Sequence, residues 1–252
     1  MPGISSPIGV FDSGVGGISV LGELARTLPR ETFLYYGDNL HAPYGTKPEE
    51  EVLGYVRGVM DHLMAQDVKA VVIACNAATS VAAAQLRAEL ELPIIGMEPA
   101  LKPAAEQRRG GQILVLATPM TLRLPKFQAL YDRYGEGAVR LPCPGLMELV
   151  ESMAFDQAQR YLEEHFLAYD MQQVDAVVLG CTHYVFLRPI LEQILPGHVR
   201  ILDGNAGTAR QLARVLEQRG LLTDEKEGAI RLETSGDPTV VLPLMQTLLA
   251  RA

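Results

Sequence analysis

The chain carries one short pattern twice, at a nearly constant spacing. Lys69–Ala77 reads KAVVIACNA and Asp175–His183 reads DAVVLGCTH, so that Cys181 follows Cys75 by 106 residues. Three further pairs of segments recur at about the same spacing: Ile8–Ser13 with Ile113–Thr118, Phe33–Tyr36 with Val139–Leu141, and Ile94–Gly96 with Ile201–Asp203. Four strand positions in register predict two similar domains, related by an approximate two-fold axis.

Short apolar runs alternate with longer segments whose apolar residues recur at helical spacing. This alternation predicts an α/β fold with mainly parallel sheets covered on both faces. The predicted strands are Ile8–Phe11, Phe33–Tyr36, Ala70–Ala74, Ile94–Gly96, Ile113–Ala117, Val139–Leu141, Ala176–Gly180 and Arg200–Leu202. The predicted helices are Gly17–Leu28, Pro48–Gln66, Ser80–Leu90, Leu122–Tyr134, Asp156–Met171, Phe186–Ile194 and Gly207–Gln218.

The repeat also predicts the domain boundaries. We expect a first domain over residues 1–100 and 207–252, and a second over residues 101–206. The last segment has no counterpart in the second repeat, so we expect it to return to the first domain. Ligands of open parallel sheets bind beyond the carboxyl ends of the strands, and we therefore expect an active site in the cleft between the domains.

Composition excludes several classes of protein. The net charge of -8 argues against a nucleic-acid partner, and the basic cluster Lys102–Arg109 is expected to be a solvated helix face. No run approaches the roughly 20 apolar residues of a membrane span. The N-terminus has no basic stretch followed by an apolar one, as a signal peptide would. We expect a cytoplasmic protein.

Three sparse cysteines argue against a disulfide framework, and five scattered histidines argue against a structural zinc site. Cys75 and Cys181 each end an apolar strand and precede a helical segment, whose N-terminus stabilises a thiolate. A racemase must remove a proton from one face of the α-carbon and deliver one to the other, which two thiols can do. Cys143, between two prolines, has no such twin and is expected to be structural.

Polar residues gather at the same predicted strand ends. The turn Asp12–Gly17 can bind a carboxylate through its N–H groups, or it can be an ordinary glycine-rich turn. Asp12 could hold an ammonium group, and His183 could assist Cys181. The hydroxyl and amide side chains beside the cysteines, or at the equivalent strand end, could bind a carboxylate or cap helices. These are Asn76, Thr79, Thr118, Thr121 and Thr182. The residues expected at the site on these grounds are Asp12, Ser13, Asn76, Thr79, Thr118, Thr121, Thr182 and His183. Pro43, Tyr44 and Gly45 follow another strand end after Asp38, and Glu151 follows the matching strand of the repeat; taken alone, these would be a loop and a surface helix acid.

The chain resembles the glutamate racemases, within the aspartate/glutamate racemase superfamily. The resemblance covers nearly the whole chain, in the right order. Four strings carry it: IGVFDSGVGG at Ile8–Gly17, YGDNLHAPYG at Tyr36–Gly45, IACNAATS at Ile73–Ser80 and LGCTHY at Leu179–Tyr184.

The resemblance implies a reaction that needs neither a metal nor another cofactor. It implies that Cys75 acts on D-glutamate and Cys181 on L-glutamate. Asp12 and His183 match residues that assist the thiols, while Asp38 and Glu151 match more distant acids. The substrate contacts implied are Asp12, Ser13, Tyr44, Gly45, Asn76, Thr182 and His183. It further implies D-glutamate supply for peptidoglycan, a homodimer and, in some members, binding to DNA gyrase.

The chain departs from the family pattern where Ala77 replaces the usual threonine after Cys-Asn, and Thr79 could compensate in part. Pro119 and Met120 are also bulkier than usual. A related racemase for aspartate or a hydantoin therefore stays open. So do a non-enzymatic regulatory binder and a nucleotide-dependent enzyme that uses the Asp12–Gly17 turn, although that turn is not a GxGxxG motif.

Overall fold

The computed structural model describes residues 2–252 and divides into two compact units. The first runs to Met97 and resumes from Asn205 to Ala252, and the second is Glu98–Gly204. In the described part of the chain, no helix is long and apolar enough to cross a membrane.

The first unit has a five-stranded parallel sheet in the order β4-β3-β1-β2-β9. Every residue of β1 is buried. Because successive side chains of a strand point to opposite faces, β1 must be covered on both of them. The strands are β1 (Ile8–Asp12), β2 (Phe33–Gly37), β3 (Ala70–Ile73), β4 (Ile94–Gly96) and β9 (Ile230–Thr234).

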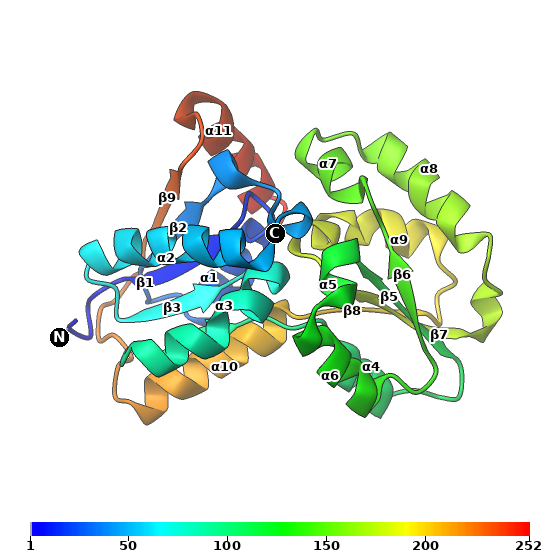
Figure 1. The fold of residues 1–252 in the computed structure, drawn as a ribbon, viewed down its shortest axis with the longest axis horizontal. Coiled ribbons are helices and arrows are strands. Elements are labelled where there is room, and N and C mark those ends of the chain that lie inside the picture. The colour runs from blue at the N-terminus through cyan, green and yellow to red at the C-terminus, as the bar shows by residue number, and fades with distance from the viewer. Residues whose placement is uncertain (1) are drawn as a thin grey trace. The chain divides into compact units, whose positions relative to one another are not determined.

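Two groups of helices provide this cover (Figure 1). The first group is α1, α10 and α11, in which α1 contacts the other two helices. The second group is α2 and α3, which contact each other. The helices are α1 (Ile18–Thr27), α2 (Glu49–Ala65), α3 (Asn76–Glu89), α10 (Asn205–Gln218) and α11 (Pro238–Leu249), with the short 3-10 helices η1 (Asn39–His41) and η2 (Tyr44–Thr46) after β2.

The second unit has a four-stranded parallel sheet in the order β6-β5-β7-β8. Its strands are β5 (Gln112–Ala117), β6 (Ala138–Pro142), β7 (Val174–Leu179) and β8 (Arg200–Asp203). This order repeats the order β2-β1-β3-β4 of the first unit. The internal repeat of the sequence is therefore a repeat of sheet topology, and β9 is an addition to the first unit.

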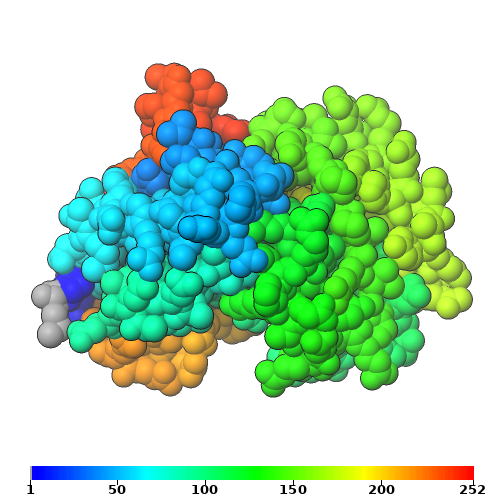
Figure 2. All heavy atoms as spheres, viewed as in Figure 1, coloured from blue at the N-terminus to red at the C-terminus, as the bar shows by residue number. Residues whose placement is uncertain are grey.

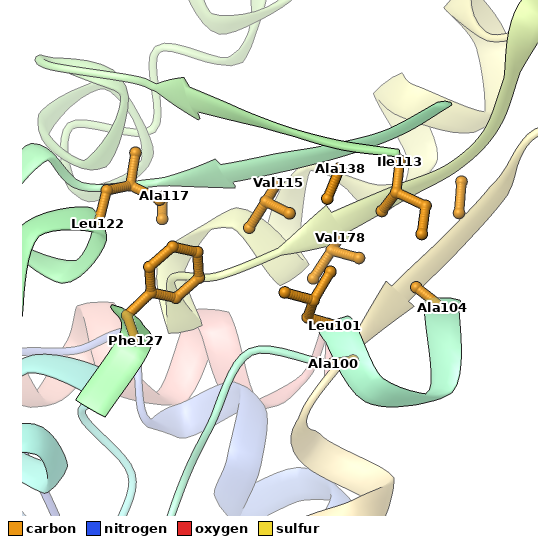
Figure 3. Close-up of a cluster of buried hydrophobic side chains, with 11 residues drawn as sticks. Ala100, Leu101, Ala104, Ile113, Val115, Ala117, Leu122, Phe127, Ala138 and Val178 are labelled. Atoms are coloured by element: carbon orange, nitrogen blue, oxygen red, sulfur yellow. The ribbon is translucent and has the colours of Figure 1, made fainter. Parts of the chain in front are cut away.

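One face of the second sheet packs on a cluster that includes Leu101, Val115, Phe127 and Val178 (Figure 3). Leu101 belongs to α4 and Phe127 to α6, so these two helices cover that face. The helical elements of this unit are α4 (Leu101–Glu106), α5 (Pro119–Arg123), α6 (Pro125–Tyr134), α7 (Leu146–Glu151), α8 (Phe155–Phe166), η3 (Met171–Gln173), η4 (Thr182–Leu187) and α9 (Arg188–Ile194).

The eight predicted strands are all present, but several helix predictions were wrong in detail. The segment predicted as one helix over Leu122–Tyr134 is two helices, because Leu124 is extended before Pro125. The helix predicted from Ser80 begins at Asn76, directly after Cys75. The helix predicted to reach Met171 ends at Phe166. Strand β9 and helices α4, α7 and α11 were not predicted.

Candidate functional site

The strand order of the first unit brings three predicted site residues to one edge of its sheet. Asp12 ends β1, Asp38 follows β2 and Cys75 follows β3, and these strands are neighbours. The backbone joins two of them directly, since the N–H of Asp38 donates to the carbonyl oxygen of Asp12 over 3.0 Å. Residues distant in the sequence thus form one half-site at the carboxyl edge.

Cys75 is the N-cap of α3, where its sulfur accepts a hydrogen bond from the N–H of Ala78 at 3.4 Å. The positive end of the helix and this donor both favour a thiolate. The thiol also donates to Ser13 Oγ at 3.7 Å, and Ser13 Oγ donates to Asp12 Oδ1 at 3.3 Å. Asp12 is therefore connected to Cys75 through a hydroxyl that can pass a proton.

The glycine-rich turn is held in place by its neighbours. The N–H of Gly14 donates to Asp12 Oδ1 at 2.9 Å, and the Tyr35 hydroxyl donates to the Gly14 carbonyl at 2.7 Å. At Gly17, a Cβ would lie 2.6 Å from the Cβ of Asp12 and 2.9 Å from that of Ala74. Only glycine allows α1 to approach β1 and β3 this closely.

Gly17→Ala is expected to destabilise the protein by about 1–3 kcal/mol and to displace Asp12, because overpacking must shift backbone on both sides. Gly54→Ala is the matched control, since Gly54 is exposed in α2 and its added Cβ would meet nothing within 4 Å. That control should gain about 0.5–1 kcal/mol from helix propensity. Urea unfolding measures both, and equal stability of the two variants would contradict the close approach.

Tyr44 and Asp38 form a buried pair beside these groups. The Tyr44 hydroxyl donates to Asp38 Oδ2 at 2.6 Å, and both residues are almost fully buried. Burial, then the hydrogen bond and charge of Asp38, and then the charges of Cys75 and Asp12, raise the pKa of Tyr44 far above its ordinary value. Tyr44 therefore keeps its proton. Pro43 and Gly45, predicted with it, flank it at η2.

In the second unit, Cys181 follows β7 as Cys75 follows β3, and it is the N-cap of the 3-10 helix η4. Its sulfur lies 3.7 Å from His183 Nδ1, and His183 Nε2 lies 2.9 Å from Glu151 Oε1. A carboxylate only accepts hydrogen bonds, so Nε2 carries the hydrogen in the neutral ring. Nδ1 is then free to accept the proton of the Cys181 thiol.

This arrangement favours the imidazolium form of His183. Burial opposes that charge, but the hydrogen bonds and charges of Cys181 and Glu151 outweigh it and raise the pKa of His183 well above its ordinary value. Burial likewise opposes the charge of Glu151, but the hydrogen bond and charge of His183 lower its pKa. Cys181 is thus a thiol beside a base, His183, which the carboxylate of Glu151 orients. This geometry can create a thiolate.

Glu151→Gln is expected to reduce stability most between about pH 4.5 and pH 6.5, by about 1–2 kcal/mol. The raised pKa of His183 gives stability below about pH 6.5 that is lost as the pH rises through the folded-state value. The lowered pKa of Glu151 gives stability above about pH 4.5 that is lost as the pH falls. Denaturant unfolding across pH 4–10 measures this.

The control is Glu148→Gln, because Glu148 is an exposed acid on the same helix α7 and forms no ion pair with any residue that the structure describes. Its stability difference from the wild type should be small at every pH. A Glu151→Gln difference that does not vary with pH would contradict the charged pair.

Cys143 behaves differently from the other two cysteines. Burial, with a smaller effect from the charge of Cys181, raises the pKa of Cys143 to about 12, so it stays a thiol at neutral pH. Its sulfur donates to the carbonyl oxygen of Leu141 at 3.4 Å, and its own carbonyl accepts from the Tyr184 hydroxyl at 3.0 Å. These contacts fit the structural role predicted for it.

The predicted threonines divide into two groups. Thr182 lies beside Cys181 and is buried. Thr118 instead caps α5 by accepting from the N–H of Thr121 at 3.2 Å, and their hydroxyls lie 2.9 Å apart. Thr79 donates to the carbonyl of Ile73 and accepts from the N–H of Met97. Its hydroxyl hydrogen is therefore committed, and Thr79 does not replace the hydroxyl missing at Ala77.

Sequence reasoning missed two contacts of Asp38. His41 Nδ1 lies 2.9 and 3.0 Å from its two carboxyl oxygens, and the Ser235 hydroxyl donates to Oδ1 at 2.7 Å. The spacing of His41, three residues after Asp38, was an available signal, whereas nothing near Ser235 points to this acid. Among residues 2–252, no group of three or more His, Cys, Asp or Glu side chains could hold a metal ion.

Comparison with known proteins is consistent across sequence and structure. The pattern of the Asp/Glu/hydantoin racemase family matches residues 8–212. A glutamate racemase of Clostridium botulinum is 47% identical over 96% of both chains. The crystal structure of glutamate racemase isoform RacE1 from Bacillus anthracis superposes with a TM-score of 0.87 at 32% identity, covering 97% of this chain and 94% of that one. Escherichia coli glutamate racemase, solved with L-glutamate and the activator UDP-MurNAc-ala, has a TM-score of 0.83 at 31% identity, with 96% and 94% covered.

Proposed function

Because this chain belongs to the Asp/Glu/hydantoin racemase family, we propose that its two cysteine half-sites interconvert L- and D-glutamate. The protein is an amino-acid racemase, an isomerase whose activity is glutamate racemisation. One observation carries the mechanism: each unit has the same strand order and presents a cysteine after the equivalent strand, β3 or β7.

The reaction needs one base and one acid on opposite faces of the same carbon. Starting from one enantiomer, a cysteine thiolate takes the α-hydrogen as a proton, and the electron pair stays on the α-carbon and its carboxylate. The other cysteine, as a thiol, delivers its proton to the opposite face. Reaction in the other direction exchanges the roles, with Cys75 acting on D-glutamate and Cys181 on L-glutamate. Geometry and protonation state together determine the efficiency of such transfers.

The two half-sites support their thiols by different means. Asp12, reached through Ser13, can exchange a proton with Cys75, and His183, oriented by Glu151, can exchange one with Cys181. In our proposal the N–H groups of the Asp12–Gly17 turn and the polar side chains of Ser13, Asn76 and Thr182 bind substrate carboxylates. Asp12 and Tyr44 face the ammonium group. These contacts need no cofactor.

We favour glutamate over aspartate as the substrate because of the names of the relatives. A relative that is 47% identical over nearly the full chain is named a glutamate racemase. Ala77 is the position at which substrate preference could change, because a hydroxyl is missing there. A hydrogen bond to a charged group contributes about 1.5–3 kcal/mol, which is enough to change affinity substantially.

A circular-dichroism assay tests the function directly. Purified protein without added cofactor should abolish the optical signal of L-glutamate and of D-glutamate, each tending to the racemic mixture. L- and D-aspartate serve as the substrate controls. Racemisation of aspartate but not of glutamate would contradict the substrate that we propose, and no change in any of the four would contradict the activity.

In the cell, we assign the enzyme to the cytoplasm and its product D-glutamate to peptidoglycan synthesis. Support comes from the three free cysteines, which suit a reducing compartment. The homodimer and the contact with gyrase that the resemblance implies stay predictions.

A further inference from the structure

Strand β9 is the part of the first unit's sheet that has no counterpart in the second unit. It pairs in parallel with β2, from Phe33 opposite Ile230 to Gly37 opposite Thr234. The next residue, Ser235, therefore reaches the same carboxyl edge as Asp38, and its N–H donates to the Gly37 carbonyl at 3.0 Å. A chain segment nearly 200 residues away from Asp38 is thus placed beside it.

The Ser235 hydroxyl makes two hydrogen bonds at this point. It donates to Asp38 Oδ1 at 2.7 Å and accepts from the N–H of Leu40 at 3.0 Å. The other carboxylate oxygen accepts from the Tyr44 hydroxyl, and the Nδ1–H of His41 donates between the two oxygens. Asp38 is only 2% exposed, so these donors replace the water that its charge would otherwise require.

The neighbours of Ser235 tie down the same loop. Thr234 Oγ1 donates to Asn39 Oδ1 at 2.9 Å and accepts from the N–H of Gly236 at 3.0 Å. The orange-red segment at the top of Figure 2 lies against a blue part of the surface. The contact includes the hydrogen bond from the N–H of Leu40 to the Ser235 hydroxyl. The C-terminal segment therefore fixes both the backbone that follows β2 and the carboxylate that it carries.

We propose that Ser235 is a positioning residue for racemisation, acting through Asp38 on Tyr44. A tyrosine hydroxyl has one hydrogen to donate and can also accept. With Asp38 fixed, the Tyr44 hydroxyl donates its one hydrogen to the carboxylate of Asp38. The Tyr44 oxygen can then only accept, which suits the substrate's ammonium group rather than a carboxylate. The backbone N–H of Asp38 donates to the carbonyl oxygen of Asp12, so the Tyr44 hydroxyl that Asp38 holds lies at the same sheet edge as Asp12 and Cys75. This inference rests on the proposed function.

The test compares Ser235→Ala, Ser235→Thr and the control Thr239→Val. Thr239 is a hydroxyl residue on the same segment that contacts Asp237 and not Asp38. Ser235→Ala should raise the KM for both enantiomers about tenfold, the usual effect of losing one hydrogen bond to a charged group, and change kcat less. Ser235→Thr keeps the hydroxyl and should restore the KM. The control should have the wild-type KM. The control and Ser235→Thr should melt near the wild-type temperature, whereas Ser235→Ala should melt a few degrees lower and stay folded in the assay, because one donor to a buried carboxylate is lost.

The outcomes separate the inference from the function. Glutamate racemisation by the wild type with an unchanged KM in Ser235→Ala would refute the inference alone, as would a Ser235→Thr variant no better than Ser235→Ala. A wild type inactive on glutamate would refute both. Because the racemisation equilibrium constant is one, kcat/KM must fall equally in the two directions, which checks the measurements internally.

Discussion

Replacing Cys75 or Cys181 by serine is expected to lower glutamate turnover by about a thousandfold or more in both directions. A hydroxyl has nearly the size of a thiol but does not form the anion near neutral pH, so each variant loses one of its two proton carriers. Both enantiomers are affected, because every turnover uses one thiol as base and the other as acid. Steady-state circular dichroism with each enantiomer measures the loss.

The matched control is Cys143→Ala. Cys143 is also buried at a strand end of the second unit, but its pKa of about 12 keeps it protonated, and it donates to a backbone carbonyl. Its replacement should leave turnover within about threefold of the wild type, since no proton transfer passes through it. Either serine variant retaining more than a tenth of the wild-type turnover would refute the two-thiol mechanism.

Lys69→Met is expected to cost about 3–5 kcal/mol of unfolding free energy, the largest stability effect that we predict. Lys69 Nζ lies 2.6 Å from Glu31 Oε2, and the two side chains are only 1% and 3% exposed. The other oxygen of Glu31 accepts from the N–H of Thr223 at 2.9 Å. Removing the ammonium group leaves a carboxylate buried without its counter-charge, which is the costly way to break such a pair.

Two further variants make this measurement decisive. Lys69→Met combined with Glu31→Leu removes both charges and should recover most of the loss. Lys102→Met breaks the ion pair of Lys102 with Glu106, two side chains that are 55% and 58% exposed. This change should lower the unfolding free energy by less than about 1 kcal/mol. Urea unfolding gives all three values. A loss for Lys69→Met no larger than that for Lys102→Met would show that the buried pair does not stabilise the fold.

The sheets could be predicted from the sequence because their central strands are buried on both faces. Such strands are continuous apolar runs, and residues 70–73 and 176–179 are clear examples. Strand β9 was missed because Ile230–Thr234 lies at the sheet edge and is partly exposed. Its apolar residues therefore alternate with charged ones instead of forming a continuous apolar run. The helices α4 and α7 were missed because a segment of six residues is too short to show the helical periodicity of apolar residues.

The candidate site was predictable to the extent that the chain repeats itself. The matched strings around Cys75 and Cys181 indicated two equivalent strand ends with Asp12 and His183 beside them, and the family resemblance added roles for Asp38, Tyr44 and Glu151. Ser235 could not be found in this way, because its contact with Asp38 depends on an unpredicted edge strand. The site roles predicted for Thr79 and Thr118 stay predictions, because the same residue types serve both ligand binding and the capping and backbone contacts that the structure shows.

The most direct test of the two-thiol account is the deuterium content of the first product molecules formed in deuterated water. If one thiol takes the substrate's α-hydrogen and the other, equilibrated with solvent, delivers the replacement, D-glutamate formed from L-glutamate should carry one deuterium at its α-carbon. The reverse reaction should give the same result, with little deuterium in the unreacted substrate of either direction. Product that keeps the hydrogen of its own substrate would mean that a single base serves both faces, and it would contradict the account.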